Sequence, residues 1–219
     1  MGTENSYLMK RYEKNFKMFK IKAILLEALV IILLSFNFSL AQEDVHKLDM
    51  TLGNADAKVT IIDYSSLTCP HCATFHEEVF PKLKEEYIET GKVKLIFREV
   101  YFDGPGLWAS LVARCSDPKK FFPLVDLLLR RQTTWSRSDS QIEIVNGLTS
   151  IGKQAGLKEG DVLKCLKDRD KAKSLVEWYQ YHAQNDKIES TPTILVNGKK
   201  MPDRSFDSLR SEIENYLND

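Results

Sequence analysis

The sequence predicts an α/β fold in which a helical segment interrupts a small sheet, and three observations support this. A strand-like run, Lys58 to Tyr64, leads directly into an apolar helical pattern. About eighty residues between Pro105 and Asp186 then form successive amphipathic helices. After them, Thr193 to Val196 predicts a further strand, and Asn197-Gly198 predicts a tight hairpin. The order is strand, helix, strand, helical insertion, strand, strand, helix.

Residues 1–41 are interpreted as a targeting segment. Six basic side chains between Lys10 and Lys22 precede an apolar run from Ala23 to Phe36, which Glu27 interrupts once. Ser39-Leu40-Ala41 presents small residues at the two positions that a signal peptidase reads, so cleavage is predicted after Ala41. The alternative is a retained membrane anchor, because the apolar run approaches the length of a bilayer span. In both cases the rest of the chain is exported.

The distribution of charge argues against a nucleic-acid-binding protein. Residues 1–41 hold six of the 31 basic and three of the 31 acidic side chains, so the remaining chain is slightly acidic. Nucleic-acid-binding domains instead carry a basic surface. No nucleic-acid partner is therefore expected.

The first part of the core is expected to comprise residues 42–104. Glu43 to Asn54 is interpreted as an irregular lead-in to the first strand. The helix that follows is expected to kink or restart at Pro81 and to end at Gly91. Alternating apolar residues predict a second strand over Lys92 to Val100.

Residues 105–187 are predicted to form an inserted helical subdomain, and residues 188–219 complete the core. The expected helices span Leu107 to Cys115, Phe121 to Arg131, Gln141 to Ala155, Lys158 to Lys167 and Asp168 to Gln184. Lys199 to Met201 should return antiparallel to the strand before it, and Phe206, Leu209, Ile213 and Leu217 form one apolar face of a final helix. This order is typical of a thioredoxin-like fold with a helical insertion.

Cys69-Pro70-His71-Cys72 stands where the first strand gives way to its helix. A helix N-terminus has unsatisfied backbone N–H groups and a partial positive charge, so a thiol placed there loses its proton more readily. The thiolate is the form that attacks disulfides, and Cys-X-X-Cys in such a context indicates redox chemistry. Cys69 is predicted to be the reactive sulfur and Cys72 its buried partner.

The other two cysteines, Cys115 and Cys165, are candidates for a structural disulfide. An exported protein experiences oxidising conditions, and proximity already pairs Cys69 with Cys72. Two buried free thiols are the alternative for Cys115 and Cys165.

With Cys69-Pro70-His71-Cys72, Ser190-Thr191-Pro192-Thr193 and the helical insertion in place, residues 50 to 217 resemble the DsbA family of periplasmic thiol oxidases. The resemblance implies that a substrate thiolate attacks Cys69 in the disulfide form. It also implies that His71 favours the Cys69 thiolate through its ring or neighbouring backbone N–H groups; the alternative is a surface histidine without an electronic role. No cofactor and no metal ion are expected.

The resemblance assigns roles to three more residues. Thr191 and Pro192 match the place where this family carries a cis-proline beside the disulfide, which leaves the Thr191 backbone free to pair with an extended substrate. An ordinary trans-proline at the start of a strand is the alternative. Asp63 matches a buried carboxylate that exchanges a proton with the deeper cysteine; its alternative is an aspartate that caps a turn.

The predicted function is donation of the Cys69–Cys72 disulfide to reduced proteins exported to the periplasm. A membrane oxidase of the DsbB type is the partner that the resemblance implies, with membrane contact of this chain only through a retained leader.

An isomerase or reductase of the same fold remains open, because Thr191 replaces the valine of the best-known oxidases. A metal-binding module is a second alternative, since His76 completes Cys-x2-Cys-x3-His, although no fourth ligand is evident. His46 and His182 are expected to have no special role, and Trp108, Trp135 and Trp178 to belong to the core of the insertion or to a groove wall.

Overall fold

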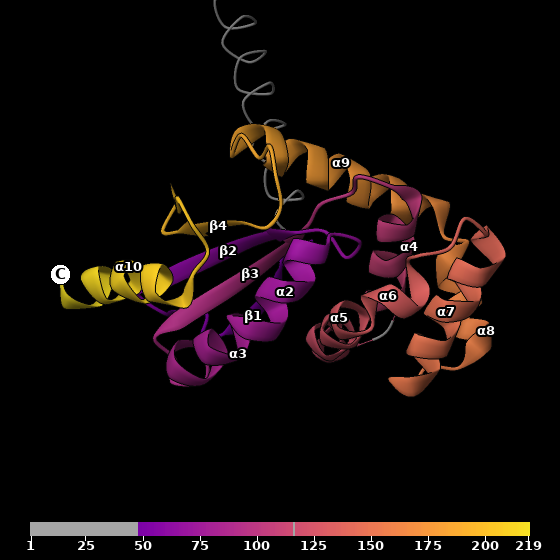
Figure 1. The fold of residues 1–219 in the computed structure, drawn as a ribbon, viewed down its shortest axis with the longest axis horizontal. Helices are drawn as coiled ribbons and strands as arrows, with labels where there is room; N and C mark the ends of the chain where they lie inside the picture. The colour runs from indigo at the N-terminus through magenta and orange to yellow at the C-terminus, as the bar shows by residue number, and fades with distance from the viewer. Residues whose placement is uncertain (1–47, 116) are drawn as a thin grey trace, which may run out of the picture. The chain divides into compact units, whose positions relative to one another are not determined.

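The computed structural model describes residues 48–115 and 117–219, which form one compact unit (Figure 1). The targeting segment and His46 lie outside the described residues. Within them, no helix has the length and apolar character that a bilayer span needs.

A five-stranded mixed sheet forms the centre of the fold, with the strand order β1-β3-β2-β4-β5. Among the strands of the described residues, β2 and β3 form the parallel pair, with Asp63 of β2 opposite Phe97 of β3. The strands are β1 (Met50–Gly53), β2 (Val59–Ser65), β3 (Val93–Glu99), β4 (Thr193–Val196) and β5 (Lys199–Lys200). The sheet therefore has the expected α/β connectivity, in which a helix joins the parallel pair.

The helical connection between β2 and β3 is broken where proline predicted a break. It consists of α2 (Pro70–Glu78), α3 (Phe80–Leu83) and the π-helix η1 (Lys84–Ile88). Pro81 is in the first turn of α3, where its missing N–H is tolerated. The interruption at Val79 confirms the restart that the sequence indicated.

Between β3 and β4 lie helices only, as predicted for the described residues of this region. They are α4 (Gly104–Ala113), η2 (Pro118–Lys120), α5 (Phe121–Arg130), α6 (Gln132–Trp135), α7 (Gln141–Gln154), α8 (Glu159–Leu166) and α9 (Arg169–Asn185). In Figure 1, α4 to α8 gather beside the sheet and α9 runs from them back to it. A disulfide joins Cys115 after α4 to Cys165 of α8. Trp135 and Trp178 are buried in this region, as expected.

The chain closes with the predicted hairpin and helix. β4 and β5 are antiparallel, and their turn places Asn197 and Gly198 at positive φ, 46° and 82°. These dihedrals are the reason why the Asn-Gly pair is favoured there. α10 (Phe206–Asn218) begins after Ser205, whose side chain accepts a hydrogen bond from the N–H of Ser208.

The two faces of the sheet bury different helices. Val59 and Ile61 of β2 pack in one cluster with Phe75 of α2, Leu83 of α3 and Leu209 of α10. On the other face, Tyr64 and Leu195 pack against Tyr179 of α9. A third cluster fills the helical insertion and extends to Leu67 and Cys72.

The N-terminal part of the described chain corrects one prediction. Residues Met50–Gly53 were expected in an irregular lead-in, but they form β1, which pairs antiparallel with β3. β1 is a short edge strand, and its half-buried and exposed residues alternate over only four positions. This alternation is too short to predict a strand from the sequence. The pairing partner of β1 is about forty residues away, so no local signal specifies it.

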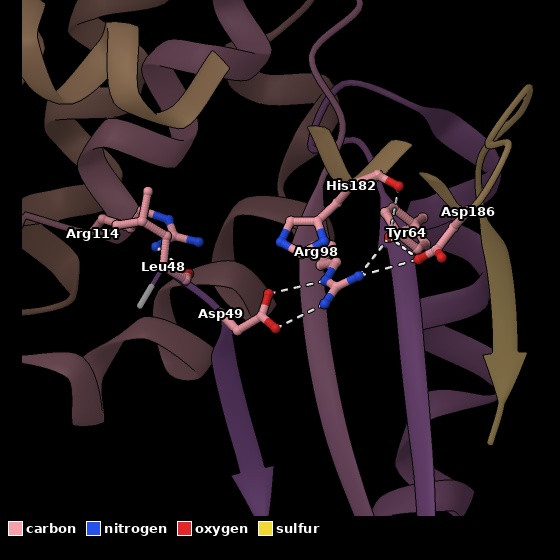
Figure 2. A network of polar contacts seen from close by, with 7 residues as sticks. All are labelled: Leu48, Asp49, Tyr64, Arg98, Arg114, His182 and Asp186. Carbon is pink, nitrogen blue, oxygen red and sulfur yellow. Dashed lines mark hydrogen bonds and ion pairs between the residues drawn. The ribbon is translucent and has the colours of Figure 1, made fainter. Parts of the chain in front are cut away.

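An ion pair and a hydrogen bond, from Arg98 and Arg114, connect this N-terminal segment to the sheet and to α4 (Figure 2). Arg98 of β3 binds both carboxylate oxygens of Asp49 at 2.9 Å and also reaches Asp186 after α9 at 3.2 Å. Arg114 after α4 binds the carboxylate of Glu99 with two bonds of 2.6 Å and donates to the carbonyl of Leu48 at 3.0 Å. The beginning of the described chain is thus tied to β3 and α4.

Candidate active site

Cys69 is the residue that immediately precedes α2, and Pro70 is the first residue inside the helix. Among the described residues no side chain caps this helix end, and backbone N–H groups of the first turn, those of His71 and Cys72, act on the Cys69 sulfur. Cys69 is half-buried, whereas Cys72, one turn further on, is only 1% exposed. Both are free thiols, so the structure represents the reduced form.

The two thiols have opposite acidities. The pKa of Cys69 falls from 9.0 to about 5, mainly because the Cys72 thiol donates a hydrogen bond to its sulfur. The Thr191 side chain and the backbone N–H groups of Cys72 and His71 lower this pKa further, against the opposing effect of burial. Burial raises the pKa of Cys72 far above its ordinary value. At neutral pH the pair therefore consists of an accessible thiolate and a buried thiol.

Thr191 and Pro192 lie directly beside Cys69. The peptide bond between them is cis, and the Cys69 sulfur lies 3.6 Å from the Thr191 carbonyl oxygen. Thr193 begins β4, and its hydroxyl group donates to the carbonyl of Ser190 at 2.7 Å, which closes the turn around the proline. The structure thus brings the predicted Thr-Pro segment and the predicted Cys-X-X-Cys segment together.

His71 acts on Cys69 through its backbone. The residue is exposed, and its N–H group contributes to the lowered pKa of Cys69. Of the two routes that the sequence left open for His71, the backbone route is the one that this geometry supplies.

Asp63 lies inside β2 and is 2% exposed, so it does not cap a turn. Burial raises its pKa from 3.8 to about 6, although a 2.5 Å hydrogen bond from the Ser65 hydroxyl and the charge of His76 act in the opposite direction. Asp63 also acts electrostatically on Cys72, where its charge raises the thiol pKa further. A buried carboxyl group that titrates near pH 6 and interacts electrostatically with a buried thiol has the acidity that proton exchange with this thiol requires.

Sequence reasoning did not identify Gln132 of α6. Its side-chain amide is 5% exposed and donates to the carbonyl oxygens of Leu67 at 2.8 Å and of Cys69 at 3.1 Å. The Leu67 carbonyl belongs to the segment that joins β2 to α2, so one buried amide fixes the approach to the reactive cysteine. A glutamine at the start of a short helix carries no sequence signal for such a contact.

Thr68 and Asp103 form a second contact that the sequence did not reveal. The Thr68 hydroxyl donates to Asp103 at 2.8 Å, and the other oxygen of Asp103 accepts from the N–H of Gly106 at 2.7 Å. Asp103 thus caps α4 while it holds the residue before Cys69.

Comparisons with known proteins agree with this geometry. The profile of the family described as Thioredoxin matches residues 46–215. The putative protein-disulfide oxidoreductase of Rickettsia bellii is 35% identical over 170 residues, which cover 77% of this chain and 64% of that protein. Disulfide bond formation protein D of Bacillus subtilis is 31% identical over 175 residues, 76% of each protein. The crystal structure of Wolbachia pipientis alpha-DsbA1 superimposes with a TM-score of 0.72 at 26% identity, covering 78% of this chain and 92% of that one.

The chain thus spans less than two thirds of the length of the Rickettsia relative, but more than three quarters of the Bacillus one. The match to the family profile includes both cysteines, the helical insertion and the cis-proline segment. From this match and from the shared fold, the chain belongs to the thioredoxin superfamily, among its DsbA-like members.

Proposed function

We propose that this protein is a thiol:disulfide oxidoreductase that donates the Cys69–Cys72 disulfide to reduced exported proteins. The single observation that carries the proposal is the difference in acidity between the two sulfurs. A stabilised Cys69 thiolate favours the reduced form of the protein, and a couple whose reduced form is favoured is a strong oxidant.

The reaction transfers two electrons from a substrate dithiol to the protein. A substrate thiolate attacks the Cys69 sulfur, the Cys69–Cys72 bond breaks, and Cys72 leaves as a thiolate that takes up a proton. A second substrate thiolate then attacks the substrate sulfur of the mixed disulfide, which forms the substrate disulfide and releases Cys69 as a thiolate. Asp63 is the group that supplies the proton to Cys72, because it is a buried carboxyl group that interacts electrostatically with this thiol and titrates near pH 6.

The cis Thr191–Pro192 segment provides the surface on which the substrate lies. Proline has no N–H group, so the backbone of Thr191 stays available to pair with an extended chain as a short added strand. The Thr191 carbonyl is 3.6 Å from the Cys69 sulfur, so a substrate paired there carries its cysteine to the reactive atom.

The cellular setting and the partners follow from the leader and from the chemistry. The basic and apolar leader directs the chain to the periplasm, where its substrates are newly exported proteins with reduced cysteines. Re-oxidation of Cys69 and Cys72 requires an oxidant, and a membrane oxidase of the DsbB type is the partner proposed for it. Only a retained leader brings this chain itself into the membrane.

Two alternatives make different predictions. A reductase has a potential near that of thioredoxin, about −270 mV, and an isomerase has one near that of protein disulfide isomerase, about −180 mV, whereas an oxidase has one near that of DsbA, about −120 mV. A metal-binding module needs a complete ligand set, and His76 is hydrogen-bonded to Asp126 at 3.1 Å. The acidity of Cys69 favours the oxidase.

The test combines an equilibrium with a trapping experiment. The oxidised protein is incubated with an unfolded, reduced substrate protein, and its couple is titrated against glutathione. Rapid oxidation of the substrate, a potential well above that of thioredoxin, and mixed disulfides on Cys69 in a Cys72→Ala variant support the proposal. A thioredoxin-like potential, or bound metal without disulfide transfer, contradicts it. Cys69→Ala is the control and must trap nothing.

A further inference from the structure

His76 lies on the same face of α2 as Cys72, one helical turn after it. The two residues are four positions apart, and both are buried, Cys72 at 1% and His76 at 4% exposure. The His76 ring stacks on Phe80 of α3 with 4.5 Å between ring centroids. Neither the disulfide transfer nor the proton exchange proposed above uses this buried histidine.

Asp63 faces the same layer as His76. Side chains alternate along a strand, and Val59 and Ile61 of β2 pack against α2 and α3, so Asp63 also points to that side of the sheet. His76 and Asp63 interact electrostatically, and the histidine opposes the effect of burial on the carboxyl group. Asp63 is thus enclosed between the sheet and the helix that carries both Cys72 and His76.

Asp126 of α5 connects His76 with the solvent. The His76 Nε2 atom lies within hydrogen-bond distance, 3.1 Å, of an Asp126 carboxylate oxygen, and the Asp126 side chain is 40% exposed. The same carboxylate oxygen accepts from Arg130 at 2.9 Å. Asp126 lines a groove of about 980 Å³ between β1, α3 and α5. Asp126 thus connects the buried His76 ring to the surface, while His76 acts on Asp63 through its charge.

We propose that His76, held by Asp126, is a positioning residue for Asp63 that controls whether this carboxyl group can take the proton of Cys72. The inference rests on the proposed thiol:disulfide function and assigns to it a residue outside the Cys-X-X-Cys and Thr-Pro segments. In its imidazolium form, His76 stabilises the carboxylate form of Asp63 by charge. The carboxylate is the form that accepts the Cys72 proton when the protein is re-oxidised.

The affected step is closure of the Cys69–Cys72 disulfide from a mixed disulfide on Cys69. The Cys72 thiol gives its proton to the Asp63 carboxylate, and the resulting thiolate attacks the Cys69 sulfur. The bond between Cys69 and the bound thiol breaks, and that thiol leaves as a thiolate. No further oxidant is needed, because the mixed disulfide itself supplies the oxidising equivalent.

The charged and titratable groups around His76 come from three elements. Those that face it within the described chain are Cys72 of α2, Asp63 of β2, and Asp126 with Arg130 of α5. Glu77, the next residue of α2, interacts with Arg130. Phe80 of α3 contributes an apolar ring.

The test measures how fast Cys72 displaces glutathione from a Cys69–glutathione mixed disulfide as a function of pH. In the wild type, the rate is expected to rise through an inflection near the Asp63 pKa of about 6. His76→Gln removes the imidazole, whose charge lowers the Asp63 pKa, and should move the inflection upward by about one pH unit. At pH 6 the variant should therefore close the disulfide about five-fold more slowly, because the carboxylate fraction of Asp63 falls by that factor. Asp126→Asn should also move the inflection to higher pH. Asp126→Glu keeps the carboxylate and should leave the inflection where it is in the wild type.

The matched control is His182→Gln, since His182 of α9 is equally buried, at 3% exposure, but packs against Trp178 and Tyr181. It should leave the inflection unchanged. An inflection at the wild-type pH in both His76→Gln and Asp126→Asn overturns the proposal.

A measurement on the wild type covers the case in which His76→Gln does not fold. The carboxyl carbon of Asp63 is followed by NMR through a pH titration, together with the His76 ring. The inference is supported if the Asp63 carboxyl signal and the His76 ring signals both change over the same pH range. It is contradicted if the Asp63 signal changes while the His76 ring signals stay constant. If the wild type fails to close the disulfide at all, the proposed function itself is wrong, which is a different outcome from an unshifted inflection.

Discussion

The side-chain amide of Gln132 donates a 3.1 Å hydrogen bond to the carbonyl oxygen of Cys69, the residue that bears the reactive sulfur. The same nitrogen donates to Leu67 at 2.8 Å, so a single buried side chain from the helical insertion holds the segment that enters α2. The helical insertion therefore helps to fix the geometry of the active site directly and does not only cover the sheet.

Replacement of Gln132 by alanine should destabilise the protein by about 1–3 kcal/mol, because the buried carbonyl of Leu67 loses its donor. Urea unfolding of the reduced protein measures this change. Gln154→Ala is the control, since Gln154 makes an exposed 3.4 Å contact with Ser150. Equal midpoints for the two variants would show that the Gln132 amide contributes nothing.

Replacement of Cys72 by alanine should raise the pKa of Cys69, because the hydrogen bond from the Cys72 thiol is the largest cause of its low value. Thr191→Val should raise this pKa by a smaller amount, since the Thr191 side chain is a lesser cause. Thiolate absorbance in the far ultraviolet as a function of pH gives both values. If Thr191→Val raised the pKa of Cys69 more than Cys72→Ala did, the Cys72 hydrogen bond would not be the main cause of the low pKa.

The stability of the reduced protein relative to the oxidised one should increase as the pH rises from 6 to 9. The Cys69 pKa is about 5 when folded and 9.0 as the ordinary value, so the unfolded state binds more protons between these limits. The contribution of the Cys69 thiolate to the free energy of unfolding of the reduced protein is thus complete above pH 9, and it is lost as the pH falls towards 5. Urea midpoints of both forms at pH 6, 7 and 8 test the sign. If the reduced form lost stability relative to the oxidised form as the pH rose, the proposed acidity of Cys69 would be wrong.

Arg114→Met should cost about 3–5 kcal/mol, because it leaves the carboxylate of Glu99 buried without its partner. Both side chains are at most 4% exposed, and the guanidinium also lies over Phe121 and Trp178. The double variant Glu99→Leu/Arg114→Met should recover most of the loss.

The control for this ion pair is Lys153→Met, which removes an exposed pair with Glu159 and should cost less than about 1 kcal/mol. Thermal or urea unfolding of the wild type and the three variants measures the differences. A double variant as unstable as Arg114→Met would mean that packing, and not the unpaired charge, causes the loss.

The sequence predicted the elements whose signals are local. Cys69 was expected at a helix start because a β-branched run stops just before it, and the Asn197-Gly198 turn has the dihedrals that its residues favour. It could not predict β1, whose four residues become a strand only by pairing with β3. The insertion was recognised by its helical periodicity, and its boundaries at residues 105 and 187 stay a prediction.

The candidate site divides in the same way. Cys69, Cys72 and the Thr191–Pro192 segment carry motif signals, and the structure brings them within contact. The contacts of Gln132 with Cys69 and of His76 with Asp126 join residues at least fifty positions apart, and they depend on how α5 and α6 pack against α2. Such contacts need the tertiary fold, because no spacing in the sequence encodes them.

The most direct test of the proposed chemistry is the rate of Cys69 alkylation by iodoacetamide in the reduced protein, measured from acid to alkaline pH. The rate reports the fraction of thiolate, which the environment at the start of α2 stabilises. We expect a half-maximal rate near pH 5, the pKa of Cys69 in the folded protein. A half-maximal rate near the ordinary thiol value of 9.0 would contradict the proposal that Cys69 is a stabilised thiolate.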